Sequence, residues 1–95
     1  MDESTLEITN QRGTELEGVI RFTSEGEVVV EVPFSVSDGT DRFEVEFPRD
    51  VRQGMLVVTL HSPEEQTYEE SVPAGVPEYY ITIRSDGIDI IWAEN

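Results

Sequence analysis

Residues 79–92, YYITIRSDGIDIIW, contain the clearest pattern that indicates the fold. Apolar and polar side chains largely alternate on both sides of Asp86-Gly87, and a period of two residues is the pattern of a half-buried β-strand. Asp-Gly is a preferred dipeptide for a two-residue hairpin turn, because glycine adopts positive φ without strain. A turn at this dipeptide pairs Ile83 with Ile90 on one face. We therefore predict a β-hairpin over these residues.

The same alternation recurs along the whole chain, and clusters of Gly, Pro, Asp and Ser separate the alternating segments. No window shows the 3.6-residue period of an amphipathic helix. The segments that we predict as strands are residues 5–10, 16–23, 27–36, 41–47, 55–61, 67–72, 79–84 and 88–92. The pattern predicts an all-β fold, an antiparallel β-sandwich of the immunoglobulin-like kind with about seven to eight strands.

A second hairpin is predicted from the loop length that places apolar residues opposite one another. A three-residue loop at residues 24–26 pairs Ile20 with Val30, whereas a two-residue loop would set Ile20 against a glutamate. The longer loop is therefore expected. Pro33 lies in the strand that follows and has no N–H to donate, so this strand is expected to lie at an edge or to contain a bulge.

A third hairpin is predicted at residues 38–39, another Asp-Gly dipeptide. This turn pairs Phe34 with Phe43 on the face that the second hairpin already buries. On the outer face the same register sets Glu31 directly opposite Glu46. Two like charges in such a pair are unfavourable in dilute buffer and weakly so in strong salt.

The charge balance is the most unusual feature of the composition. The 95 residues contain 21 acidic and six basic side chains, which gives a formal net charge of -15. All six basic residues are arginines, and lysine is absent. An acid-rich, lysine-free surface is typical of proteins that work in molar salt, where a Debye length of about 3 Å screens carboxylates from one another. We predict that residues 1–95 form a single acidic, salt-adapted domain.

This charge also limits the possible partners. Binding to nucleic acid or to an anionic membrane is disfavoured, because each phosphate contact would form against the field of the whole domain. The apolar runs are too short to span a bilayer, and the first residues do not resemble a signal peptide. A cytoplasmic location is expected if the chain is complete as it stands. An alternative function is an acidic inhibitor or nucleic-acid mimic that occupies a basic site on another protein.

Several of the side chains on which enzyme chemistry relies are missing or scarce in the sequence. There is no cysteine, and His61 is the only histidine. Cysteine nucleophiles, thiolate metal sites and multi-histidine sites are therefore excluded. The acidic loops at residues 37–41 and 85–89 do not match a calcium-binding EF-hand and are explained as turns. We predict no catalytic residues, no cofactor and no metal site.

The hairpin of residues 79–92 divides its large side chains between two faces. Trp92 is expected opposite Ile81 on the core side. Tyr80 and Ile91 project from the other face, where a fully solvated sheet would carry charge. We predict that Tyr80 and Ile91 form a candidate interaction surface, with Val57 beside them.

Four segments together resemble a known class of domain. They are Leu-Glu-Ile-Thr-Asn at 6–10, Gly-Glu-Val-Val-Val at 26–30, Gly-Met-Leu-Val-Val at 54–58 and Ile-Arg-Ser-Asp-Gly-Ile-Asp-Ile at 83–90. Their order resembles the small immunoglobulin-like or cupredoxin-like sandwiches of haloarchaea. A blue-copper site is excluded, because it needs a cysteine and two histidines. The resemblance implies scaffolding, adhesion or subunit contact. We therefore predict a non-enzymatic structural or protein-interaction module that binds another protein or a second copy of itself.

Overall fold

The computed structural model of the chain describes residues 2–62 and 64–93. These residues form eight strands and no helix, so the all-β prediction is confirmed, and each predicted segment overlaps one strand. The strands are β1 (Asp2–Asn10), β2 (Leu16–Ser24), β3 (Glu27–Val36), β4 (Gly39–Phe47), β5 (Gln53–Ser62), β6 (Gln66–Pro73), β7 (Glu78–Arg84) and β8 (Gly87–Ala93).

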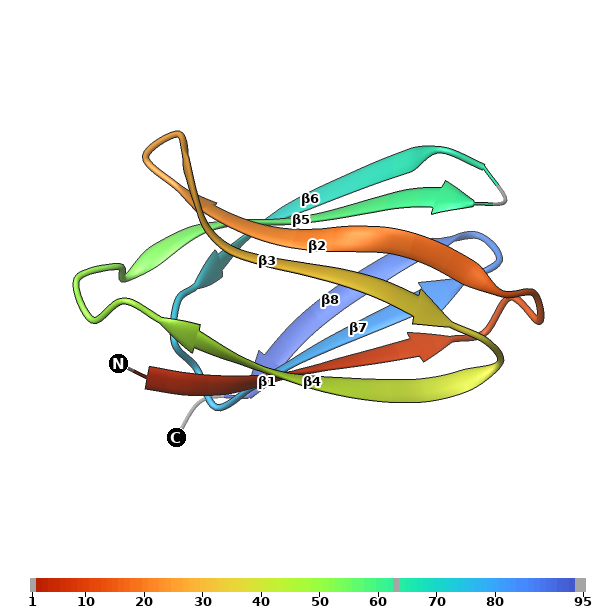
Figure 1. Cartoon of the computed structure of the whole chain (residues 1–95), viewed down its shortest axis with the longest axis horizontal. Helices are drawn as coiled ribbons and strands as arrows, with labels where there is room; N and C mark the ends of the chain where they lie inside the picture. Colours follow the sequence, from red (N-terminus) through yellow and green to blue (C-terminus); the bar gives the residue numbers. More distant parts are fainter. Residues whose placement is uncertain (1, 63, 94–95) are drawn as a thin grey trace.

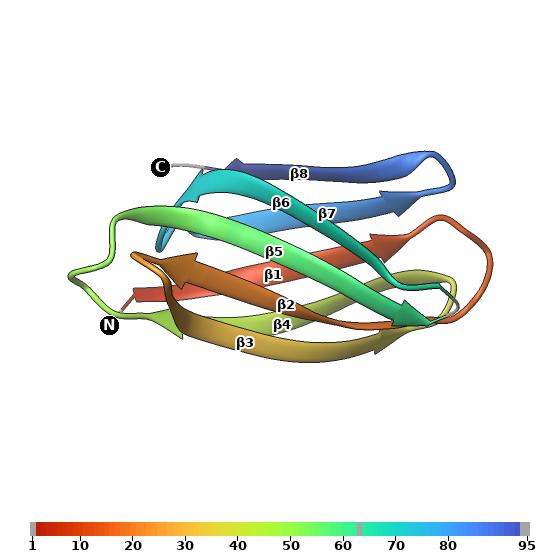
Figure 2. The same cartoon turned by 90° about the horizontal axis from the view of Figure 1, so that it is seen from above.

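The eight described strands form two four-stranded sheets that lie face to face (Figures 1 and 2). Sheet A has the order β4-β1-β7-β8, and sheet B has the order β3-β2-β5-β6. The predicted β-sandwich is therefore confirmed. The prediction that it is antiparallel needs one correction, because β1 and β7 run parallel, with Ile8 opposite Ile81. Parallel neighbours cannot be joined by a tight turn, and here strands β2 to β6 lie between them in the chain.

The immunoglobulin-like arrangement is not confirmed by this strand order. In a constant-type immunoglobulin domain the first two strands share a sheet, whereas β1 lies in sheet A and β2 lies in sheet B. Strands β2 and β3, β5 and β6, and β7 and β8 form hairpins within a sheet. The remaining connections cross from one sheet to the other.

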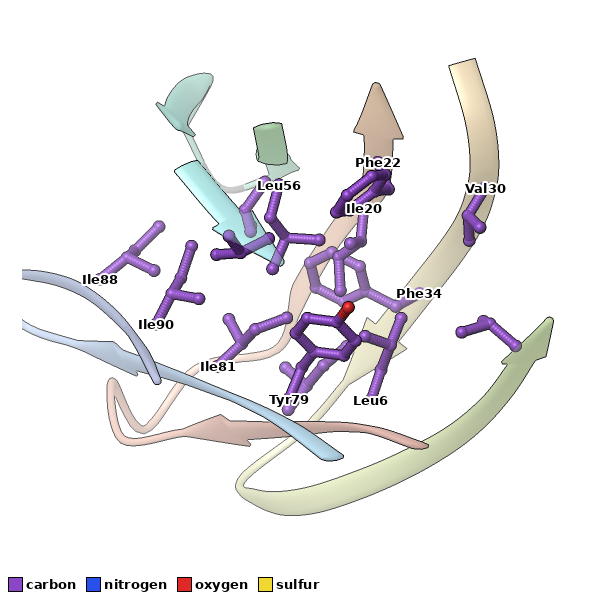
Figure 3. Close-up of a cluster of buried hydrophobic side chains, with 14 of the residues drawn as sticks. Leu6, Ile20, Phe22, Val30, Phe34, Leu56, Tyr79, Ile81, Ile88 and Ile90 are labelled. Atoms are coloured by element: carbon purple, nitrogen blue, oxygen red, sulfur yellow. The ribbon is translucent and has the colours of Figure 1, made fainter. Parts of the chain in front are cut away.

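The core lies between the sheets and is built from the inward-facing residues of both. Figure 3 shows Ile81 of sheet A and Leu56 of sheet B pointing into this space. Phe47 joins the two sides, because its ring meets the Phe22 ring edge-on at a centroid distance of 4.9 Å and lies 5.8 Å from the Tyr79 ring. Such aromatic pairs stabilise a core beyond the area that they bury.

The hairpin of β2 and β3 differs from the predicted register. Its turn has two residues, Glu25 and Gly26, with φ angles of 53° and 80°. Ile20 lies opposite Val32, two residues away from its predicted partner. The register shifts by one residue after Phe22, and this bulge keeps Ile20 paired with an apolar residue despite the shorter turn. Strand β3 lies at the edge of sheet B, as its proline predicts.

The predicted hairpin of β3 and β4 is wrong, because the two strands belong to different sheets. Phe34 is buried and Phe43 packs against the same core, but they are not cross-strand partners. Glu31 does not face Glu46 and instead forms an ion pair with Arg21 of β2 at 2.6 Å. Two strands that each have one apolar face can pair as a hairpin within one sheet. They can equally well face each other from the two sheets of a sandwich. The Asp-Gly dipeptide marks the turn but does not distinguish these arrangements.

The hairpin of β7 and β8 is present, with its turn at residues 85–86 rather than 86–87. Ile83 therefore lies opposite Ile88 and not Ile90. The register is shifted by two residues, and a shift of two leaves every side chain on the face that was predicted for it.

Candidate functional site

Tyr80 and Ile91 lie directly opposite each other across β7 and β8, on the outer face of sheet A. Ile91 is 62% exposed, and Tyr80 is partly exposed. The Tyr80 hydroxyl donates a hydrogen bond to the Glu78 carboxylate, which fixes the ring beside Ile91. The structure thus brings together two of the three residues that were predicted to form an interaction surface.

Val57 does not lie beside them. It belongs to β5 of sheet B and lies between Arg21 and Glu69 in the register of that sheet. Its neighbours Leu56 and Val58 are buried, so Val57 projects from the outer face of sheet B. The sequence could not reveal this separation, because the partition of strands between the two sheets depends on pairings between distant segments.

The outer face of sheet B forms a second surface of low charge. The ion pair between Arg21 and Glu31 compensates two of its charged groups. Val28, in β3, is 53% exposed. The uncharged residues that the register places on this face include Val19, Thr23, Val28, Pro33, Met55, Val57, Thr59, Thr67 and Ser71.

Charged side chains surround the Tyr80–Ile91 pair and are largely compensated. On the β1 side, Arg42 Nη1 lies 3.8 Å from Glu7 Oε1, and Arg42 Nη2 lies 3.6 Å from Glu78 Oε1. At the other end of β7 and β8, Arg84 Nη2 lies 2.8 Å from Asp89 Oδ2. The apolar pair therefore lies between ion pairs, and it lies on the side of the sheet where β8 forms the edge.

A groove runs between β6 of sheet B and β8 of sheet A, which lie side by side in Figure 2. One part of it, about 320 Å³, is lined by Glu70, Ile90, Ile91 and Trp92. An adjoining part of about 180 Å³ also includes Tyr68 of β6 together with Tyr80 and Ile91. The groove thus joins the exposed pair on sheet A to the edge of the sandwich. Sequence analysis did not identify Glu70, because it lies on the inward-facing side of β6, where an apolar residue is expected.

Trp92 lies at the end of this groove and is partly buried against the core. It lies opposite Tyr79 rather than Ile81, which corrects the predicted pairing. Tyr79 is fully buried, and its hydroxyl donates a hydrogen bond of 2.6 Å to the Pro73 carbonyl oxygen. Burial raises the pKa of the Tyr79 phenol to about 12. Because this phenol is neutral, hydrogen-bonded and buried in the core, we assign Tyr79 a structural role.

His61, Arg49 and Arg52 do not line this groove. His61 is exposed near the end of β5. Arg49 and Arg52 are exposed in the loop between β4 and β5, and neither lies within 4.0 Å of a carboxylate oxygen in the part of the chain that the structure describes. Residues 2–62 and 64–93 contain no group of three or more His, Cys, Asp or Glu side chains placed to hold a metal ion. The same residues contain no helix that could cross a membrane.

The chain matches no protein-family model, and neither a curated protein nor a solved structure matches it. Its resemblance to haloarchaeal sandwich domains stays a prediction. The surfaces described above are therefore the basis for a functional proposal.

Proposed function

We propose that this chain is a non-enzymatic protein-interaction module, adapted to high salt, that binds its partner through β7 and β8 on the outer face of sheet A. The observation that carries the proposal is the exposure of Ile91, which is 62% accessible beside Tyr80 in a protein with a net charge of -15. An isoleucine and a tyrosine paired next to a groove form the kind of apolar centre, bounded by polar groups, that protein interfaces use.

The surroundings of the pair support an interface of this kind. Arg42 pairs with Glu7 and Glu78, and Arg84 pairs with Asp89, so nearby carboxylates are partly compensated. Desolvating this region on binding therefore costs less than desolvating a surface of unpaired carboxylates. The partner is another protein or a second copy of the chain.

The test compares variants that place a carboxylate on this surface with one that places it elsewhere. We expect Tyr80→Glu and Ile91→Glu to abolish association. Ile91→Glu should change the free energy of unfolding by less than about 1 kcal/mol, since Ile91 is 62% exposed. Val28→Glu is the matched control, because it replaces another exposed apolar residue on the outer face of sheet B. Urea unfolding of each variant gives the stability, and sedimentation equilibrium in about 2 M KCl gives self-association.

Binding to another protein is measured by immobilising each variant and comparing what it retains from the same extract. A partner that is retained by the wild type and by Val28→Glu, and lost with Ile91→Glu, supports the proposal. Loss of association with Val28→Glu alone would instead assign the interface to sheet B. If duplex DNA displaced the partner and Ile91→Glu had no effect, the acidic mimic would be the better explanation.

A further inference from the structure

β8 is the least protected edge among the described strands. Edge strands avoid unwanted pairing by means of proline, bulges, charge and short length. The β3 edge has Pro33 and a bulge, and the β6 edge carries Glu69 and Glu70 next to each other. The β4 edge carries four charged residues along its length. β8, with the sequence GIDIIWA, has only Asp89.

The hydrogen bonds of β7 determine which backbone groups of β8 point outward. The Thr5 N–H donates to the Pro77 carbonyl oxygen, and the Gln11 N–H donates to the Ile83 carbonyl oxygen, both at 2.9 Å. Pro77 and Ile83 therefore direct their carbonyl groups toward β1, as do the alternate residues between them. Residues of β8 that lie opposite these positions form the non-hydrogen-bonded pairs of the antiparallel ladder, and their own N–H and C=O groups point away from β7.

The register identifies these residues as Ile88, Ile90 and Trp92, which lie opposite Ile83, Ile81 and Tyr79. No strand within residues 2–62 and 64–93 pairs with this side of β8. The N–H and C=O groups of these three alternate residues thus lie along one edge, at the spacing that pairing with another strand requires.

The groups beside this edge indicate the chemistry of a partner. Glu70 lines the groove with Ile90, Ile91 and Trp92, and Asp89 lies on the outer side of the same strand. A strand added here would have one face against Glu70 and the other against Asp89 and Ile91. Basic side chains on such a strand would meet the Glu70 carboxylate on one face. On the other face they would meet Asp89, which already pairs with Arg84 at 2.8 Å.

We propose that an extended, basic segment of a partner protein binds to β8 as an added strand of sheet A. Its backbone hydrogen-bonds with Ile88, Ile90 and Trp92, and its lysine or arginine side chains contact Glu70. Addition of a strand to an exposed sheet edge is a general mode of peptide recognition. The inference rests on the proposed function and specifies the partner and the geometry. A second copy of the chain is a poorer occupant, because it would bring a second acidic strand edge, with its own Glu70, against this one.

The first experiment uses a peptide of alternating lysine and valine, acetylated and amidated, of the length of β8. Trp92 is the only tryptophan, so its fluorescence reports binding at the edge. Amide hydrogen exchange by NMR gives the geometry. We expect the peptide to protect the amides of Ile88, Ile90 and Trp92, which are free in the unbound protein. The amides of Asp89 and Ile91 already bond to β7 and should change little.

Two controls separate strand addition from charge attraction. The same peptide with every backbone nitrogen methylated keeps its lysines and loses its donors, and we expect it not to bind. Glu70→Gln should weaken binding of the unmethylated peptide by about two- to fivefold. Glu44→Gln removes the same charge from β4 at the far edge of sheet A and should leave the affinity unchanged within error.

Three results would each overturn the proposal. They are equal affinities of the methylated and unmethylated peptides, uniform protection of the amides along β8, and equal effects of Glu70→Gln and Glu44→Gln on the affinity. Protection of Ile88, Ile90 and Trp92 that appears with protein concentration alone would identify a second copy as the occupant and also overturn it. These results are distinct from a failure of the proposed function. Strand addition can fail while Ile91→Glu still abolishes partner binding through the outer face.

Discussion

Tyr79 allows a sharp test of the packing between the sheets, because one buried group links the core to pH. Burial raises the pKa of its phenol from 10.0 to about 12. Below about pH 10 the phenol is neutral in the folded and the unfolded chain, and its contribution to stability is fully present. Between about pH 10 and 12 the unfolded chain loses the proton while the folded chain keeps it. Stability therefore falls as pH rises through this range, by up to about 2.7 kcal/mol in total.

The perturbation is Tyr79→Phe, which keeps the ring and removes the group that titrates. At neutral pH the variant should be less stable than the wild type by about 1 kcal/mol, because it lacks the hydrogen bond to the Pro73 carbonyl oxygen. Above about pH 11 the order should reverse, since only the wild type loses stability through this phenol. All other side chains are the same in both proteins, so the difference between them reports on the Tyr79 phenol.

The assay is urea unfolding of both proteins at intervals from about pH 7 to about pH 12, followed by tryptophan fluorescence. The decisive quantity is the difference between the two free energies of unfolding at each pH. Curves that remain parallel over the whole range would contradict this prediction. They would mean that the phenol is ionised as easily in the folded state as in the unfolded one, and hence that it is not held in a water-free core.

Two further predictions concern charge and backbone packing. Raising KCl from about 0.1 M to about 2 M should increase Tm by about 10 °C or more, because screening relieves repulsion within a chain of net charge -15. Sucrose at equal osmolality serves as the control, and an equal rise of Tm in sucrose would exclude screening as the cause. Gly18→Ala should lower the free energy of unfolding by about 2 kcal/mol or more, because a Cβ there would overlap the Thr59 carbonyl oxygen. Gly87→Ala is the control, because its new methyl group meets no atom within 4 Å. Urea unfolding should show a small change in its free energy of unfolding, and equal losses of stability in the two variants would contradict this prediction.

Local patterns in the sequence were sufficient to predict the strands. The two-residue period around Ile81 and Ile83 assigns their side chains to the core whatever the exact turn, and the structure buries both. For the same reason Tyr80 and Ile91 lie on the outer face even though the register of their hairpin was predicted two residues away. Periodicity determines a face, while the register also depends on turn geometry.

Predictions that depended on distant pairings failed for a different reason. The parallel pairing of Ile8 with Ile81 joins segments from opposite ends of the described chain, and no local signal marks it. The prediction that Val57 lies beside Tyr80 and Ile91 failed for the same reason, because it also depended on how distant strands pair. Glu70 was missed because at the edge of a sandwich an inward-facing side chain can extend past the opposite sheet, so that a charged residue there still reaches water.

The central position of β1 has a consequence for the order in which the chain folds. β1 lies between β4 and β7, and its Ser4 hydroxyl bonds at 2.6 Å to the carbonyl oxygen of Val76, which is 72 positions away. During synthesis, Leu6 and Ile8 leave the ribosome long before β7 exists to cover them. Sheet B can pair earlier, since β2 and β3 form a local hairpin. We therefore expect folding in milliseconds to seconds, as in other β-proteins rich in distant contacts. β1 is synthesised before β7, yet we expect it to be among the last of the eight described strands to be incorporated.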